Sequence, residues 1–410
     1  MPTTPDEATN GAVCGHERVL LMAGLSLLPV GALVGAAAGT GVARTTRNVV
    51  GAHVHAGSVG WTALAVLAFA GPVIRVKTTP ARPVDDGRWA SAAAWLAVVA
   101  SVAIVAAVAL DLPAMEGVSG AALVVAVTAS IVLVVREGRA STWTTPAIGI
   151  VAALVVFLAG SVTGVIAASL TRDGGVVAGR TLAAHAALLT VPYIVLATAA
   201  IVEWAVHDDE SRVPATTAGT LQVGFAVLSA IALFAGNLNG SFALIQANVP
   251  LLLTSIAIFV VRVGPRVFDA GWIALADRMW LGISVAALTV AAGLFLHLLF
   301  EVGARRYSSI ELVPDWLIFA VDHVSLGVVV TAAVLGAIAG THPGSRAMRI
   351  VDRAAAGATV CGLAAAVAGI GWKLDRLRNV GMAVFGGALV LAAVVAVRRV
   401  FAQRAGSAAR

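Results

Sequence analysis

Residues 91–110 read SAAAWLAVVASVAIVAAVAL, an unbroken run without a single charge. A helix rises about 1.5 Å per residue, so a run of this length spans roughly 30 Å, the thickness of the hydrocarbon core of a bilayer. Lipid offers no partner to backbone N–H and C=O groups, which leaves only helices and closed barrels as spanning structures. Barrel strands would be about half as long and would alternate in polarity. The stretch therefore predicts a transmembrane α-helix.

Similar runs recur along the whole chain. Of its 410 residues, 60% are hydrophobic and 12% are charged, which predicts an all-α, polytopic membrane bundle with no soluble domain. We expect a tail over 1–18, a transmembrane domain over 19–397 and a basic tail over 398–410. The twelve expected spans are 19–41, 49–74, 90–110, 117–135, 146–170, 181–206, 219–236, 242–262, 279–302, 316–339, 354–372 and 380–397.

Charge predicts how the bundle is oriented. With the N-terminus inside, the inner segments hold twice as many of the 27 Lys and Arg residues as the outer ones, so both termini are expected to be cytoplasmic. The net charge of +6 is spread between helices, which points to membrane orientation and not to nucleic acid. The expected location is the inner (plasma) membrane, with lipid as partner. The first apolar run lacks a basic leader and is expected to stay in the protein. Cys14 and Cys361 are expected to be free thiols.

Five of the eight histidines fall inside predicted spans. Ionisable groups are costly in a membrane and therefore indicate function. In the predicted topology all five lie in the outer half of the bilayer, and those of the second, sixth and tenth spans lie roughly 6 to 12 Å below the outer helix ends. These histidines are His53, His55, His185, His297 and His323.

Imidazole nitrogens from two facing helices are suitable axial ligands for a haem, which an apolar bundle accepts. His53 and His55 lie about 200° apart around a helix, so only one of them can face a given metal. A second metal is also considered. His297 and Glu301 share a helix face, and with His185 as third ligand they would suit iron, zinc or copper. The alternative places Glu301 at the membrane boundary, paired with Arg305 or Arg306.

The segment RNVVGAHVHAGSVGW (47–61) resembles the second helix of subunit I of the haem-copper oxidases, which also has twelve helices and cytoplasmic termini. FAVDHVSLGVVV (319–330) is similar to its tenth helix. The resemblance implies that His53 and His323 are the axial ligands of a b-type haem. The two imidazoles are then expected to face each other across an apolar slot, with ring nitrogens about 4 Å apart.

The chain departs from that family at the oxygen-reducing centre. Val321 stands where the high-spin haem ligand would be, and Leu189 where some members carry a tyrosine. The seventh span and its outer connection, GNLNGSFALIQANVP (236–250), contain no histidine. The resemblance thus implies a divergent relative that retains a bis-histidine haem for electron transfer or for handling O2 or NO, without an intact haem-copper centre. A redox partner or further subunits are expected.

Two other functions remain open. A secondary transporter also commonly has twelve spans, although polar groups near the midplane are expected of one. A copper- or haem-handling accessory protein would use the same histidines. The sequence assigns no catalytic residue, so whether the chain is an enzyme stays open. Gly31, Gly35 and Gly39 are interpreted as close-packing residues, and Tyr193 as a hydrogen-bonded core residue.

Overall fold

The computed structural model describes residues 15–42, 46–75, 87–139, 142–170, 175–207, 214–269, 271–303, 313–342 and 344–408. Within these ranges every regular element is a helix. Twelve helical segments are long and apolar enough to cross a bilayer. The predicted all-α membrane bundle of twelve spans is therefore confirmed, whereas the side of the membrane on which the termini lie stays a prediction.

Nine of the twelve spans are single helices. They are α1 (Gly15–Gly39), α4 (Gly87–Ala109), α5 (Pro113–Gly138), α6 (Thr145–Leu170), α9 (Thr217–Asn239), α10 (Phe242–Val267), α11 (Ala276–Gly303), α14 (Arg346–Gly371) and α15 (Asp375–Ala408). A short 3-10 helix, η4 (Trp272–Ala274), precedes α11.

The second, sixth and tenth spans are interrupted. The second comprises α2 (Arg47–His55), the π-helix η2 (Ala56–Ala63) and α3 (Leu64–Ile74). The sixth comprises α7 (Val176–Thr190) and α8 (Pro192–Val206). The tenth comprises α12 (Asp315–Asp322), the π-helix η6 (His323–Val329) and α13 (Val330–Thr341). These three spans carry four of the five histidines that the sequence places in the membrane.

Each interruption has a local cause or marks a special position. Pro192 has no N–H to bond to the preceding turn, and its ring disfavours a helical residue before it. Val191 accordingly leaves the helical region, with φ −120° and ψ −78°. In the other two spans a π-helix begins at or directly after a histidine, and π turns are frequent at functional sites.

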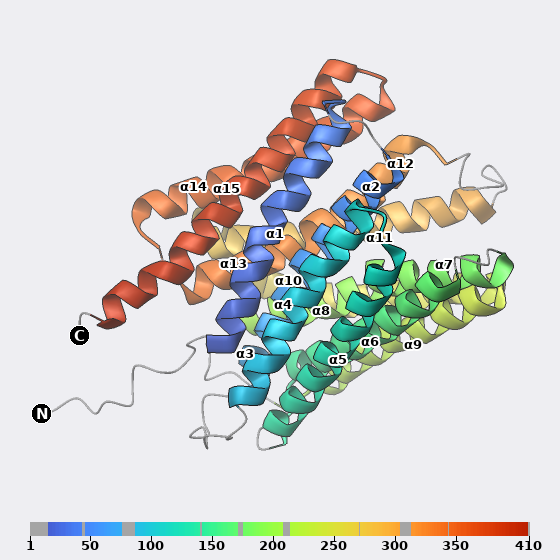
Figure 1. The fold of residues 1–410 in the computed structure, drawn as a ribbon. Coiled ribbons are helices and arrows are strands. Elements are labelled where there is room, and N and C mark those ends of the chain that lie inside the picture. The colour runs from blue at the N-terminus through green and yellow to red at the C-terminus, as the bar shows by residue number, and fades with distance from the viewer. Residues whose placement is uncertain are drawn as a thin grey trace, which may run out of the picture.

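The bundle has two ends, which we name by the course of the chain. The proximal end is where α1 begins and α15 ends, and the distal end is where α2, α7 and α12 begin (Figure 1). Helices α14 and α15 form a long antiparallel pair that packs along α1 (Figure 1). An even number of spans brings the first and the last helix back to the same end.

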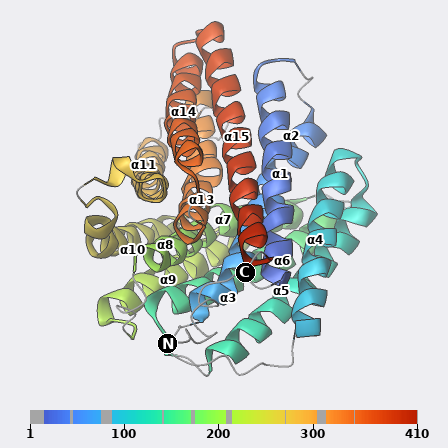
Figure 2. The same ribbon diagram turned by 90° about the vertical axis from the view of Figure 1, so that its left-hand side faces the viewer.

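The centre of the bundle is built from the proximal halves of the interrupted spans. Almost every residue of α3, α8 and α13 is buried, and the other helices surround them (Figure 2). Trp61 of η2 donates from Nε1 to Thr331 Oγ1 of α13 at 2.8 Å, and both are buried. This bond satisfies a donor that would be costly to bury alone, and it fixes the second span against the tenth.

The helices extend beyond the apolar runs at both ends of the chain. The first begins at Gly15, before the predicted span that starts at residue 19, and the last continues to Ala408, so residues 398–408 are helical, and their place in a cytoplasmic tail stays a prediction. Glu17 lies in the first turn of α1 and is 2% exposed because Arg75 pairs with it at 2.7 Å. Charged residues can thus belong to a span when they are paired. Cys361 is a free thiol, as expected, and Cys14 lies outside the described residues.

Candidate functional site

His53 and His323 lie face to face in the distal half of the bundle. His53 belongs to α2 and His323 begins η6, and their ring centroids are 5.9 Å apart with planes inclined by 23°. The two imidazoles thus lie close together, whereas the separation of their ring nitrogens and their role as ligands stay predictions.

Both rings are held by hydrogen bonds to backbone carbonyls. His53 Nδ1 lies 2.8 Å from Gly31 O of α1, and His323 Nδ1 lies 3.0 Å from Phe319 O of α12. A carbonyl only accepts, so each Nδ1 carries a proton and donates. In a neutral imidazole the lone pair is then on Nε2, the nitrogen left for a metal. The tautomer suited to ligation is therefore set by the fold.

Two glycines of α1 determine the position of the His53 ring. A Cβ built on Gly35 would collide with that ring, and Gly31, one turn earlier, supplies the carbonyl. His185 repeats the arrangement on α6, where Gly160 O accepts from His185 Nδ1 at 2.8 Å and a Cβ on Gly164 would lie 2.7 Å from the ring. In both places the glycine at position i accepts a hydrogen bond from the imidazole, and the glycine at i+4 leaves room for the ring. The sequence analysis assigned Gly31 and Gly35 to helix packing alone.

Aromatic side chains cover the His323 ring. Phe319, one turn before it, stacks on it with centroids 3.8 Å apart, and Phe385 of α15 approaches edge-on at 6.2 Å. The distal halves are otherwise loosely packed. Ala52 is the one buried residue of α2, and Leu317 and Ala320 are the buried residues of α12. The His53–His323 site, as we name it, therefore has apolar walls and incomplete cover.

His55 points away from His323. Its Nδ1 bonds Gly51 O of its own helix at 2.8 Å. This follows from the angle of about 200° between positions two apart on a helix. His53 and His55 thus lie on different sides of the second span.

The predicted second metal site is not assembled. His297 is exposed on α11. In the described part of the chain, no three His, Cys, Asp or Glu side chains lie together as a group that could hold a metal ion. His185, His297 and Glu301 therefore form no such group, because His185 packs against α6 instead. Tyr193 is fully buried beside Phe157, at a centroid distance of 5.0 Å, as a core residue.

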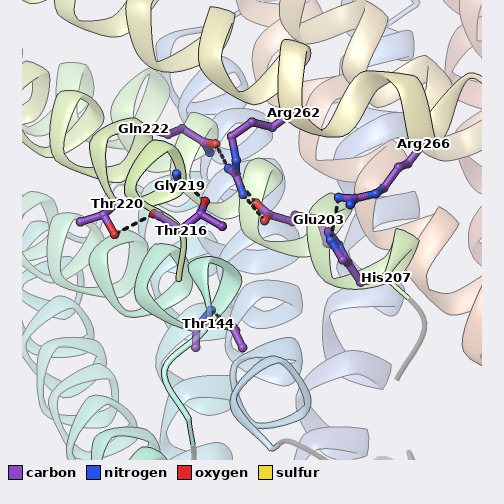
Figure 3. Close-up of polar contacts among 10 residues, drawn as sticks. Thr144, Glu203, His207, Thr216, Gly219, Thr220, Gln222, Arg262 and Arg266 are labelled. Atoms are coloured by element: carbon purple, nitrogen blue, oxygen red, sulfur yellow. Dashed lines mark hydrogen bonds and ion pairs between the residues drawn. The ribbon is translucent and has the colours of Figure 1, made fainter. Parts of the chain in front are cut away.

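A polar pocket at the proximal end was not predicted from the sequence. Arg262 of α10 bonds Glu203 of α8 at 2.5 Å and Gln222 of α9 at 2.5 Å, deep between three helices (Figure 3). Arg266, one turn further along α10, lies 2.8 Å from His207 Nε2 (Figure 3). Both arginines border a cavity of about 360 Å³. Arg262 and Glu203 lie in different spans, so only the packing of α8 against α10 reveals the pair.

Comparison with protein-family models and with curated protein sequences gave no match.

Proposed function

We propose that this chain is a haem-binding membrane protein in which His53 and His323 supply the two axial ligands of one haem. The observation that carries the proposal is the His53–His323 site itself, in which two rings from separate spans lie 5.9 Å apart. Each Nδ1 is bonded to a carbonyl, which leaves both Nε2 atoms for a metal. The resemblance of the 47–61 and 319–330 segments to haem-copper oxidase subunit I supports the same two residues.

The surroundings of the pair fit a porphyrin. Phe319 and Phe385 offer apolar contact, and the sparsely buried α2 and α12 leave surface for a flat apolar group to cover. The sequence has Cys14 and Cys361 as its two cysteines and no Cys-x-x-Cys-His segment, so the haem is held non-covalently and is b-type.

Two histidine ligands favour electron transfer over gas binding. A bound haem supplies one-electron chemistry, and a metal held by the protein on both faces has no open position for a diatomic ligand. The chain's own contribution is to fix both ring tautomers and to exclude water with Phe319 and Phe385. We infer a role as an electron carrier in the plasma membrane, working with a redox partner.

The test is the haem content of the purified full-length protein. The pyridine haemochrome assay should find about one haem per chain, with the absorption spectrum of a low-spin, bis-histidine iron. His53→Ala and His323→Ala should each abolish that spectrum while the protein remains folded, since helix packing supplies most of the stability.

His55→Ala and His185→Ala are the matched controls, because both residues lie inside spans but face away from the pair. They should keep the low-spin spectrum. Folded wild-type protein without haem, purified from cells that make haem, would refute the proposal. Loss of the spectrum in His55→Ala but not in His53→Ala would refute the ligand assignment.

The transporter alternative gains no specific support. The buried ion pairs Glu17–Arg75, Glu203–Arg262 and Asp352–Arg399 all lie toward the proximal end, whereas a substrate site is expected near the midplane.

A further inference from the structure

The proximal pocket is lined by the ends of five spans. Helices α3, α8 and α10 end there and α6 and α9 begin there. Its volume of about 360 Å³ is within the usual range for a small-molecule site and exceeds what a single inorganic ion would fill. The lining residues are Val73, Thr144, Thr145, Pro146, Glu203, Trp204, His207, Pro214, Thr216, Ala218, Arg262 and Arg266.

The described residues that line the pocket carry a net positive charge. Glu203 and Arg262 neutralise each other at 2.5 Å. His207 donates from Nδ1 to Glu203 O at 2.6 Å, so its Nε2 is a neutral acceptor for Arg266 at 2.8 Å. Within the described residues, Arg266 thus keeps its full positive charge beside the cavity, with an imidazole rather than a carboxylate as its side-chain partner.

Two helix N-termini add to this field. Thr144, just before α6, and Thr216, the N-cap of α9, both line the cavity, and their hydroxyls accept from Ala147 N at 3.3 Å and Gly219 N at 3.1 Å (Figure 3). The positive ends of the α6 and α9 helix dipoles therefore lie at the same cavity as the two arginines. Apolar side chains also line the cavity, among them Val73 and Pro146.

We propose that this pocket binds a phosphate group, with Arg266 as its principal charged partner. Planar guanidinium groups match phosphate oxygens in geometry. Basic pockets between membrane helices near the bilayer surface bind lipid headgroups. The volume and the apolar side chains leave room for the glycerol and first acyl carbons of an anionic phospholipid, which makes a lipid the expected source. This proposal does not depend on haem binding at the distal end.

The test measures thermal unfolding of the purified full-length protein in neutral detergent. Dihexanoyl phosphatidylglycerol is titrated against dihexanoyl phosphatidylcholine and against inorganic phosphate. The anionic lipid should raise the unfolding midpoint saturably, and the effect should weaken at high salt. If inorganic phosphate raises the midpoint equally and competes with the lipid, the phosphate site stands and its source is soluble. If phosphatidylcholine stabilises as well as the anionic lipid, the proposal is overturned.

Variants locate the effect. Arg266→Gln should raise the half-maximal lipid concentration about tenfold, because a hydrogen bond to a charged group is lost. Arg136→Gln, an exposed arginine of α5 at the same end, is the matched control and should bind as the wild type does. Equal lipid response in wild type and Arg266→Gln would overturn the proposal.

Ala218→Asp keeps the test decisive if Arg266→Gln folds poorly. Ala218 is exposed in the first turn of α9, where an acidic residue favours the helix, so the fold is retained while an anion is repelled from the pocket. Unchanged lipid binding in this variant would refute the site. The proposal would also fail if no phosphate compound binds. In that case the triple variant Asp208→Asn/Asp209→Asn/Glu210→Gln should destabilise the protein as much as Arg266→Gln does, since these carboxylates would be the partners of Arg266.

Discussion

The two halves of the interrupted spans differ in how they pack. Their proximal halves, α3, α8 and α13, are buried along almost their whole length, and their distal halves, α2, α7 and α12, are buried at few positions. The histidines lie in the distal halves, next to the interruptions. The same three spans therefore form the core of the fold at one end and hold candidate ligands at the other. Substitutions in the two halves should have separable effects on stability and on haem content.

The largest effect is expected at a buried ion pair of the proximal end. Arg399 is 3% exposed and pairs with Asp352, which is 5% exposed. Arg399→Leu leaves a buried carboxylate without its charged partner and should lower the free energy of unfolding by about 3–5 kcal/mol. Unfolding of the detergent-solubilised protein measures the loss. Asp352→Asn/Arg399→Leu should recover most of it, and a double variant as unstable as the single one would contradict the pairing.

A matched pair of truncations compares the two halves directly. Leu64 of α3 is 0% exposed and Val50 of α2 is 45% exposed. Leu64→Ala should cost about 2–4 kcal/mol through lost contacts and a cavity, whereas Val50→Ala should change stability by about 0.5 kcal/mol or less. Equal losses for the two variants would show that the distal half is as tightly packed as the proximal half.

The space that Gly35 leaves for the His53 ring is tested by Gly35→Ala. The added Cβ would collide with the imidazole, so the ring must move, at a cost of about 1–3 kcal/mol, and haem content should fall by at least half. Gly57→Ala is the control, because nothing lies within 4 Å of a Cβ at that position. Haem content per folded chain decides the matter. A Gly35→Ala protein with full haem content would show that the ring position does not depend on this contact.

The smallest expected effect is a pH dependence at the proximal end. His342, just after α13, has its pKa lowered by burial and by the nearby Arg18 and Arg399 guanidinium groups. The unfolded chain then binds the proton more tightly. Stability is therefore greatest above pH 6.5 and falls below it by at most about 1.4 kcal/mol per pH unit, until the folded-state pKa is reached. His342→Gln should flatten the unfolding profile between pH 7.5 and 5.5.

The sequence predicted the elements of the fold more fully than the contacts between them. Twelve apolar runs sufficed for the spans, because lipid permits few alternatives to a helix. The first and last helices extend past the predicted spans to include Glu17 and Arg399. Ion pairing between helices, which allows these charged residues to be buried, cannot be seen in a linear sequence. The π-helices of the second and tenth spans were not anticipated either, because hydropathy does not distinguish them from α-helix.

For the candidate site, depth and local motifs pointed to His53 and His323, whose rings do lie close together. The packing of His185 against Gly160 of α6 required the contact between α6 and α7, which no local pattern encodes. Gly31 and Gly35, and likewise Gly160 and Gly164, are four residues apart in the sequence. That this spacing makes room for a histidine of a neighbouring span follows only from the three-dimensional structure. Glu203 and Arg262 lie 59 residues apart, so their contact could not be predicted from spacing.

The π-helices have a consequence for which sequence changes the chain can tolerate. Within an ordinary membrane helix, deleting one residue rotates everything beyond it by about 100° and turns lipid-facing side chains into the bundle. A helix that is locally wider already contains a surplus residue, so η2 and η6 can each lose one by converting to the tighter α form. The flanking helices α12 and α13 would then keep their orientation, and the change would be confined to the π turn that His323 begins. Length variation in this protein would therefore change the distal pair before it disturbed the core.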